Sequence, residues 1–186
     1  MRNFAKEIEQ LRQYRTKPDK DDVFYKELVK KELLKDDRLI YLLNNKELED
    51  AEAENDEYFG VNILPMYLIS PTQHSTKNFV CFETFVENVS RENSIIKYQE
   101  LVFYVLCHES DLIVKECGSA RHDLLASVLI DIFQGSNLFG NQMKLISNKP
   151  STTDNDYATR TLIFSQWTSN YPMKNGKVTN LRVGNR

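Results

Sequence analysis

LVFYVLC, residues 101–107, begins the stretch that decides the fold, and we expect it to form an apolar strand. After a tight turn, an amphipathic helix is predicted from about Ser119 to Gln134, where Gly135 can end it. Apolar residues of this helix recur at four-residue spacing and form one stripe: Leu124, Leu125, Val128, Leu129, Ile132 and Phe133. A helix with one apolar face needs a sheet to cover it, so the stretch predicts an α+β domain.

The remaining strands are expected on both sides of that stretch. Before it, the predicted strands are Val61–Ile69, Asn78–Val86 and Lys97–His108, and after the helix they are Met143–Ile146 and Tyr157–Trp167. Pro65 interrupts the first strand, which suits a sheet edge or a bulge. The order is strand, strand, strand, helix, strand, strand. Short connections favour an antiparallel-dominated sheet packed on the helix, and the join through the helix could be a crossover.

Two segments flank this domain, which is predicted to span residues 60–167. Residues 1–59 read as a helical N-terminal extension that ends in an acidic loop. Its first stripe is weak, with Phe4, Ile8 and Leu11, and a second helix is expected from about Val23 to Lys35. In that second helix Phe24, Leu28 and Lys31 share a face, which Val29 and Leu33 widen, and Leu39–Leu43 predicts a further helical turn. Residues 168–186 lose all periodicity and are expected to form a flexible basic tail.

Composition limits the class of protein. The 186 residues suit one domain with an appended arm, and the 41% of apolar residues are enough for a packed core. A net charge of −3 indicates neither nucleic-acid binding nor membrane attachment, and no segment approaches the length of a membrane span. The N-terminus lacks the apolar core of a secretion signal, so we expect a cytoplasmic chain with reduced cysteines.

Charged residues concentrate in two segments that could contact a partner. Seven acids lie in the predicted loop 47–57, with no basic residue among them: Glu47, Glu49, Asp50, Glu52, Glu54, Asp56 and Glu57. Like charges repel, so the first interpretation is a solvated, mobile loop, and the second is an acidic surface that faces a partner or a channel. The tail carries the opposite charge, with Lys174, Lys177, Arg182 and Arg186 and no acid. Such basic arms can contact phosphates or order on a protein partner.

No arrangement of residues predicts catalysis or a cofactor. The possible metal ligands near the expected strand end and helix start are Cys107, His108, Glu109, Asp111, Cys117 and His122. Their spacing matches no usual zinc pattern, and strand alternation points Cys107 and His108 to opposite faces. Cys117 near Arg121 could be partly activated, but no base and orienting group accompany it. We expect Ser119 to cap its helix rather than to help bind an anion. The pattern therefore favours an assembly module over an enzyme.

The strand, turn, helix, strand, strand segment resembles the tail-terminator and head-to-tail joining proteins of long-tailed bacteriophages. The resemblance covers residues 60–167 and lies in these runs: Val105–Asp111, Gly118–Ala126, Leu129–Ser136, Met143–Ser147 and Tyr157–Phe164. It is a resemblance of periodicity and turns, not of an active site. The extension before residue 60 and the tail after Trp167 are both additional to a minimal domain of this family.

The resemblance implies a structural virion protein of the phage neck. Such proteins form a ring, usually a hexamer, that ends the tail tube and joins it to the head, while DNA passes through the lumen without sequence-specific binding. The implied partners are other copies of the chain, the tail tube protein and a head connector or head-completion protein. The acidic segment 47–57 is then a candidate lumen lining or partner contact. The alternatives are a head-completion or connector ring and, in a different class, a metal- or thiol-dependent enzyme.

Overall fold

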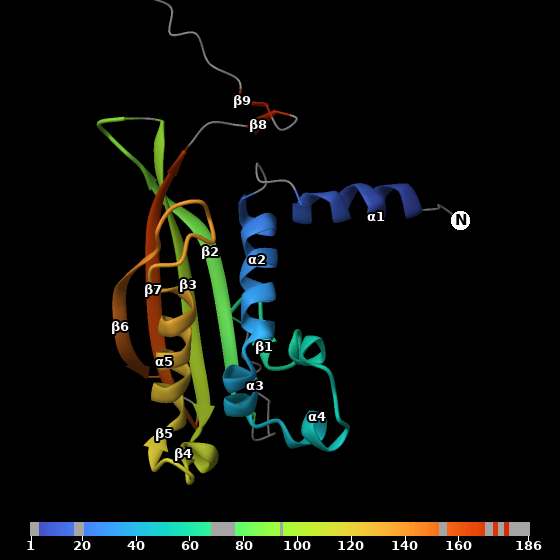
Figure 1. Cartoon of the computed structure of the whole chain (residues 1–186), viewed down its shortest axis with the longest axis vertical. Coiled ribbons are helices and arrows are strands. Elements are labelled where there is room, and N and C mark those ends of the chain that lie inside the picture. The colour runs from blue at the N-terminus through green and yellow to red at the C-terminus, as the bar shows by residue number, and fades with distance from the viewer. Residues whose placement is uncertain are drawn as a thin grey trace, which may run out of the picture.

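The computed structural model describes residues 4–16, 21–67, 77–93, 95–152, 156–169, 173–174 and 177–178. Its helices are α1 (Ala5–Arg12), α2 (Asp21–Lys35), α3 (Asp37–Leu43), α4 (Lys46–Asp50) and α5 (Arg121–Phe133), with 3-10 turns η1 (Gln13–Thr16), η2 (Asn55–Tyr58) and η3 (Glu109–Asp111). Its strands are β1 (Ile63–Leu64), β2 (Phe79–Val89), β3 (Ile96–His108), β4 (Ile113–Val114), β5 (Ser119–Ala120), β6 (Lys144–Thr152), β7 (Tyr157–Ser169), β8 (Met173–Lys174) and β9 (Lys177–Val178). The fold is α+β, as predicted (Figure 1).

The main sheet has five strands in the order β1-β2-β3-β7-β6. All its pairs are antiparallel except the one between β1 and β2, which is parallel. β1 lies at the edge, as Pro65 predicted, although it is much shorter than the expected strand Val61–Ile69, whose last two residues lie outside the described ranges. The join through α5 is the predicted crossover. It links β3 to β6, which run in the same direction, and β7 lies between them.

Helix α5 packs its apolar stripe on the sheet. Leu125, Leu129 and Phe133 are fully buried, and the Phe133 ring lies 4.9 Å from Phe103 of β3 and 6.0 Å from Phe164 of β7, between ring centroids. The predicted face is therefore confirmed. Gly135 follows the helix at a φ of +78° and its amide donates to the Met143 carbonyl at 2.9 Å, which ends the helix as expected.

The start of α5 differs from the prediction. The helix begins at Arg121, and its N-cap residue is Ala120, which makes no side-chain capping bond. Ser119 instead belongs to β5, where it pairs with Val114 of β4. The capping role predicted for Ser119 is wrong because this small ladder engages the residue before the helix begins.

Helices α2 and α3 complete the layer on the same side of the sheet. Tyr25, Val29 and Leu33 are the buried residues of α2, and Tyr25 stacks on Phe139 at 4.2 Å between ring centroids. Phe24 and Leu28 are only half-buried and Lys31 is exposed, so the predicted face of this helix is rotated. The helical turn expected at Leu39–Leu43 is confirmed by α3, and both helices share one hydrophobic core with the sheet. This core is continuous across the boundary predicted between residues 59 and 60.

The acidic segment forms two short helical pieces, so the expectation of a loop is wrong. Asn45 caps α4 by accepting a bond from the Leu48 amide at 3.4 Å, and its own amide donates to Asn62 at 2.6 Å. In η2, Glu54 and Glu57 form a capping box. Local capping thus organises this segment in spite of its charge, and its acidic side chains remain exposed.

The C-terminal part of the chain contains more regular structure than predicted. Thr168 and Ser169 belong to β7 and pair with β3, so this strand continues two residues beyond its predicted end at Trp167. Within the tail, β8 and β9 form a two-stranded antiparallel pair. Of the helices in the described ranges, none is long and apolar enough to cross a membrane.

Candidate functional site

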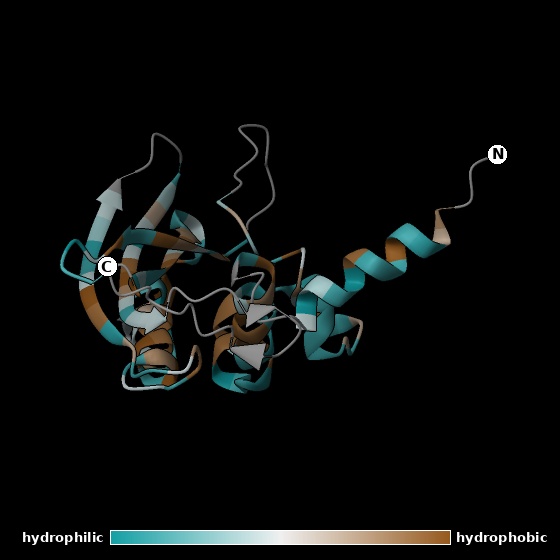
Figure 2. Cartoon of the chain, turned by 90° about the horizontal axis from the view of Figure 1, so that it is seen from above, coloured by the Kyte–Doolittle hydropathy of each residue, from teal (hydrophilic) through white to brown (hydrophobic). Residues whose placement is uncertain are grey.

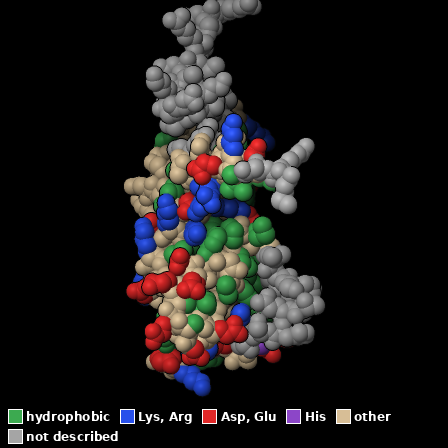
Figure 3. Space-filling view, turned by 90° about the vertical axis from the view of Figure 1, so that its right-hand side faces the viewer, with side chains coloured by type: hydrophobic (Ala, Val, Ile, Leu, Met, Phe, Trp, Pro, Cys, Tyr) green, Lys and Arg blue, Asp and Glu red, His purple; other side chains and the backbone are tan. Residues whose placement is uncertain are grey.

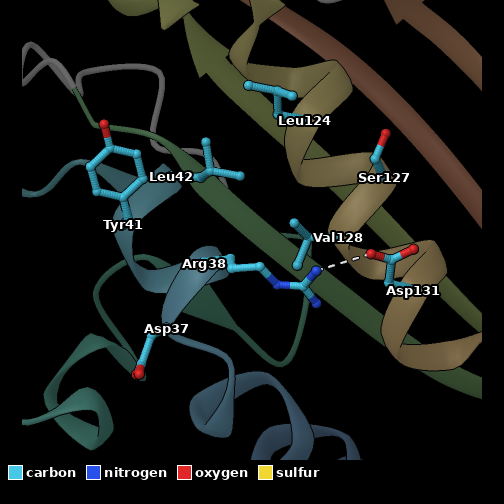
Figure 4. Close-up of a pocket in the computed structure, with 8 residues that line it drawn as sticks. All are labelled: Asp37, Arg38, Tyr41, Leu42, Leu124, Ser127, Val128 and Asp131. Carbon is cyan, nitrogen blue, oxygen red and sulfur yellow. Dashed lines mark hydrogen bonds and ion pairs between the residues drawn. The ribbon is translucent and has the colours of Figure 1, made fainter. Parts of the chain in front are cut away.

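An apolar groove with a volume of about 490 Å³ lies between α3 and α5 (Figure 4). Its lining residues come from these two helices only: Asp37, Arg38, Tyr41, Leu42, Leu124, Ser127, Val128 and Asp131. Leu42 and Val128 are buried and form its floor, Leu124 is half-buried, and Tyr41 is 56% exposed at the rim. The groove therefore presents apolar surface that no described part of the chain covers.

Arg38 connects the two walls of the groove. Its guanidinium contacts the Asp36 carboxylate at 2.7 Å and reaches Asp131 of α5 at 3.0 Å. Asp36 also caps α3, since its carboxylate accepts the amides of Arg38 and Leu39 at 3.0 and 3.3 Å. The hydrogen bond from Arg38 lowers the pKa of Asp36, and the two carboxylates raise the pKa of Arg38. One exposed ion pair thus lies beside an otherwise apolar channel.

A buried polar junction fixes α3 relative to α5. The Asp111 carboxylate accepts bonds from Arg121 Nη2 at 2.8 Å, Asn44 Nδ2 at 2.8 Å and Asn78 Nδ2 at 2.7 Å. Arg121 also donates to the Asp111 carbonyl at 2.9 Å and to the Leu42 carbonyl at 3.0 Å, and is only 6% exposed. This junction ties the end of α3, the start of α5 and the start of β2 together. It is the rigid support of the groove.

The seven predicted acidic site residues gather at one corner of the molecule. Glu47, Glu49 and Asp50 lie on α4, Glu52 and Glu54 lie in the connection, and Asp56 and Glu57 lie on η2. Acidic side chains gather toward the lower end of the face shown in Figure 3. Two lysines neutralise part of this charge: Lys46 pairs with Glu49 at 2.7 Å and Lys77 pairs with Glu47 at 3.0 Å. All seven acidic side chains are exposed.

The basic site residues of the tail are only partly described. Lys174 and Lys177 are backbone partners in the antiparallel pair β8–β9. Arg182 and Arg186 lie outside the described residues. The contacts predicted for this tail therefore remain predictions.

The cysteine and histidine residues occupy separate environments. Cys107 is buried in the core, where desolvation raises the pKa of its thiol, and His108 points to the other face against Tyr157, with ring centroids 5.3 Å apart. Cys117 is exposed, and His122 Nε2 lies 3.3 Å from Asp123 Oδ1. Among the residues that the structure describes, no three His, Cys, Asp or Glu side chains converge on a common metal position.

The groove and its supporting junction were not found from the sequence. The sequence suggests Asp111 only as a possible metal ligand and Arg121 only as a neighbour of Cys117. Two signals were present: an arginine at the first position of an apolar helix, and the Asn44-Asn45 pair directly after an apolar run. Asn44 adopts a left-handed φ of 49° that ends α3, a position in which asparagine is tolerated.

The sequence of this chain matches a known protein family. A sequence model of the YomW family matches residues 36–166, and the chain belongs to this family. The matched region begins at the cap of α3 and extends into β7, so it includes the groove, the junction and the acidic corner and leaves out α1 and α2. No curated protein matches the chain. Membership of this family fits a phage-associated protein, and it carries no statement about the neck or about a ring.

Proposed function

We propose that this phage-associated chain is a structural virion protein that forms a ring at the phage neck, ends the tail tube and joins tail to head. The proposal rests on one observation, which concerns the second face of the sheet, opposite to the helices. Helices α2, α3 and α5 cover one face, and among the described residues no helix lies over the other (Figure 2). Large side chains are exposed on this second face, namely Phe85, Tyr98 and Trp167, and Tyr98 and Trp167 are direct cross-strand partners. Exposed aromatic residues of this kind favour a protein contact.

The lower end of the second face is closed by the chain itself. Phe79, Cys81 and Leu106 form a small buried cluster there, with Leu64 and Tyr104 packed against it. Tyr67 contacts the Tyr104 ring at 4.8 Å between centroids. Phe85, Tyr98 and Trp167 are exposed beyond this cluster, toward the upper end of the face, where a neighbouring subunit could cover them.

The outer edge of the sheet is less suited to subunit pairing. β6 forms this edge and carries Lys144, Lys149 and Pro150, with a register shift between Leu145 and Ser147. Lysine, proline and bulges on an edge strand oppose the addition of another strand. The proposed ring contacts therefore use faces of the molecule rather than strand addition at β6. The acidic corner would then line the lumen, where it repels DNA, or would meet a basic partner ring.

Native mass spectrometry of the purified chain and of isolated necks tests the proposal. We expect a closed cyclic oligomer, a hexamer by the resemblance, and labelled chain at the junction of head and tail in electron micrographs. Replacing Trp167 by Ser should weaken the oligomer, while replacing the exposed edge residue Lys149 by Ser should not. A single copy per particle, or a dimer without a ring, would refute the proposal. A ring on the head side of the junction would indicate a head-completion or connector protein instead.

A further inference from the structure

Helix α1 carries a further exposed apolar stripe. Ile8 and Leu11 of α1 are 49% and 60% exposed, Phe4 at the N-cap is 56% exposed, and no residue of α1 is buried. These three residues follow the i, i+4, i+7 spacing of a helix that packs along one stripe. A helix of eight residues is marginal in water when it has no tertiary contact. The stripe therefore needs a surface to cover it.

Among the described residues of the same copy, none covers the apolar stripe of α1. Turn η1 is held on α2 by the Arg15–Glu27 ion pair at 2.6 Å, which fixes where α1 departs. Figure 1 shows α1 extending away from α2 on the side opposite to α5, and Figure 2 shows the same projection from above, with brown apolar patches along α1. α2 thus separates α1 from the groove of the same copy.

The groove between α3 and α5 has the length that the stripe requires. Along α5 its lining runs from Leu124 to Asp131, seven residue steps or about 10.5 Å of helix rise. The stripe from Phe4 to Leu11 also spans seven residue steps and the same rise. The stripe and the groove are thus both about two helical turns long. If α1 lay in the groove, it would form a three-helix packing with α3 and α5.

The charges beside the two surfaces are complementary. On a helical projection, Glu7 flanks one side of the α1 stripe and Arg12 flanks the other. Arg38 flanks the groove from α3, where Asp37 also lines it, and Asp131 flanks it from α5. Arg38 and Asp131 pair with each other at 3.0 Å, so α1 in the groove would exchange this exposed pair for pairs with its own charges. One direction of α1 in the groove places Glu7 on the Arg38 side and Arg12 on the Asp131 side. The opposite direction would bring like charges together.

We propose that α1 of one copy lies in the α3–α5 groove of a neighbouring copy. The contact is heterologous, since arm and groove are different surfaces, and repeated by rotation it closes a ring. The inference deepens the proposed function and rests on it, because it names the contact that links successive subunits. One short stripe covers less area than a stable interface of about 1,600 Å² requires, so the contact acts together with the open sheet face.

Disulfide trapping between two differently tagged copies tests the pairing. Both copies carry Cys117→Ser to remove the exposed native thiol; one also carries Ile8→Cys on the stripe and the other Ser127→Cys at the exposed groove wall. We expect a mixed-tag disulfide after mild oxidation. The matched control replaces Ile8→Cys with Lys6→Cys, which lies on the opposite side of α1 and should form at least about tenfold less product. Equal yields for both positions would overturn the pairing.

Assembly measurements separate this inference from the proposed ring. Ile8→Asp, or Ser127→Trp to fill the groove, should weaken subunit association roughly tenfold to a hundredfold, the effect of losing one buried aliphatic contact. Both positions are exposed in the single copy, so thermal melting should stay unchanged. Lys149→Trp, at an exposed site away from the groove, is the control. Rings that form with undiminished affinity in both variants would overturn the arm contact and leave the ring function standing. A wild-type chain that forms no ring, free or on particles, would refute the ring function itself. A chain that carries both Ile8→Cys and Ser127→Cys tests the role of the neighbour, because a disulfide formed only within single copies would overturn that role.

Discussion

Replacing Asp111 by Ala should destabilise the fold more than any change at a surface ion pair. The substitution removes the acceptor of three side-chain bonds, from Arg121, Asn44 and Asn78, and leaves the Arg121 guanidinium without a counter-charge while its side chain is 7% exposed. Arg121 keeps its bonds to the carbonyls of Leu42 and residue 111, so the loss is less than the sum of three broken bonds. We expect a cost of about 3–5 kcal/mol, the usual range when one partner of a buried ion pair is removed.

Urea denaturation at neutral pH measures this cost as the change in unfolding free energy. Asp131→Ala is the matched control, because its side chain is 63% exposed and its ion pair with Arg38 should contribute at most about 1 kcal/mol. The double variant Asp111→Ala with Arg121→Met should recover at least about 1 kcal/mol, since no charge is then left buried alone. If Asp111→Ala cost no more than Asp131→Ala, the junction would not be the support of the groove that we infer.

Three further predictions concern the core, acid stability and the reactive side chains. Leu129→Ala should lower the unfolding free energy by about 2–5 kcal/mol, measured by thermal or urea unfolding. Asp123→Asn changes an exposed residue that pairs with Arg160 and should lower it by at most about 1 kcal/mol. Equal losses in the two variants would show that the buried face of α5 is assigned wrongly. Asp36 has a lowered pKa in the folded state, so its contribution is present above the unfolded pKa of about 4 and is lost as the pH falls through the folded value; Asp36→Asn should reduce the slope of stability against pH in that acid window. His108→Ala combined with Cys117→Ser should leave folding and infectious-particle yield largely intact, and stoichiometric zinc together with loss of function would favour the enzyme alternative.

The elements with strong periodicity were predictable from the sequence. The stripe of α5 and the apolar runs of β2, β3 and β7 each satisfy one period over many residues, and each is found within a few residues of its predicted position. Gly135 ends α5 because only a residue tolerant of positive φ fits there. Local physics alone is sufficient for such features.

Features that depend on tertiary contacts were not predictable in the same way. The buried face of α2 is centred on Tyr25, Val29 and Leu33 because Tyr25 stacks on Phe139, which lies 114 positions further along the chain. The groove exists only because α3 and α5, far apart in sequence, lie side by side. The charge of the acidic segment predicts a loop, but capping by Asn45 and Glu57 stabilises short helical pieces there in spite of that charge.

The position of β7 has a consequence for how the chain is made. β7 lies between β3 and β6, yet the ribosome synthesises it after both, and its pairing ends with Ser169 against Ile96. Until residues 157–169 emerge, β3 and β6 have no strand to join them, and the apolar stripe of α5 has only part of its sheet. Folding is therefore delayed until the last long strand arrives, and the delay leaves apolar surface open to aggregation. A message truncated before β7 would yield no smaller folded protein, so only nearly complete copies could acquire the surfaces needed for assembly.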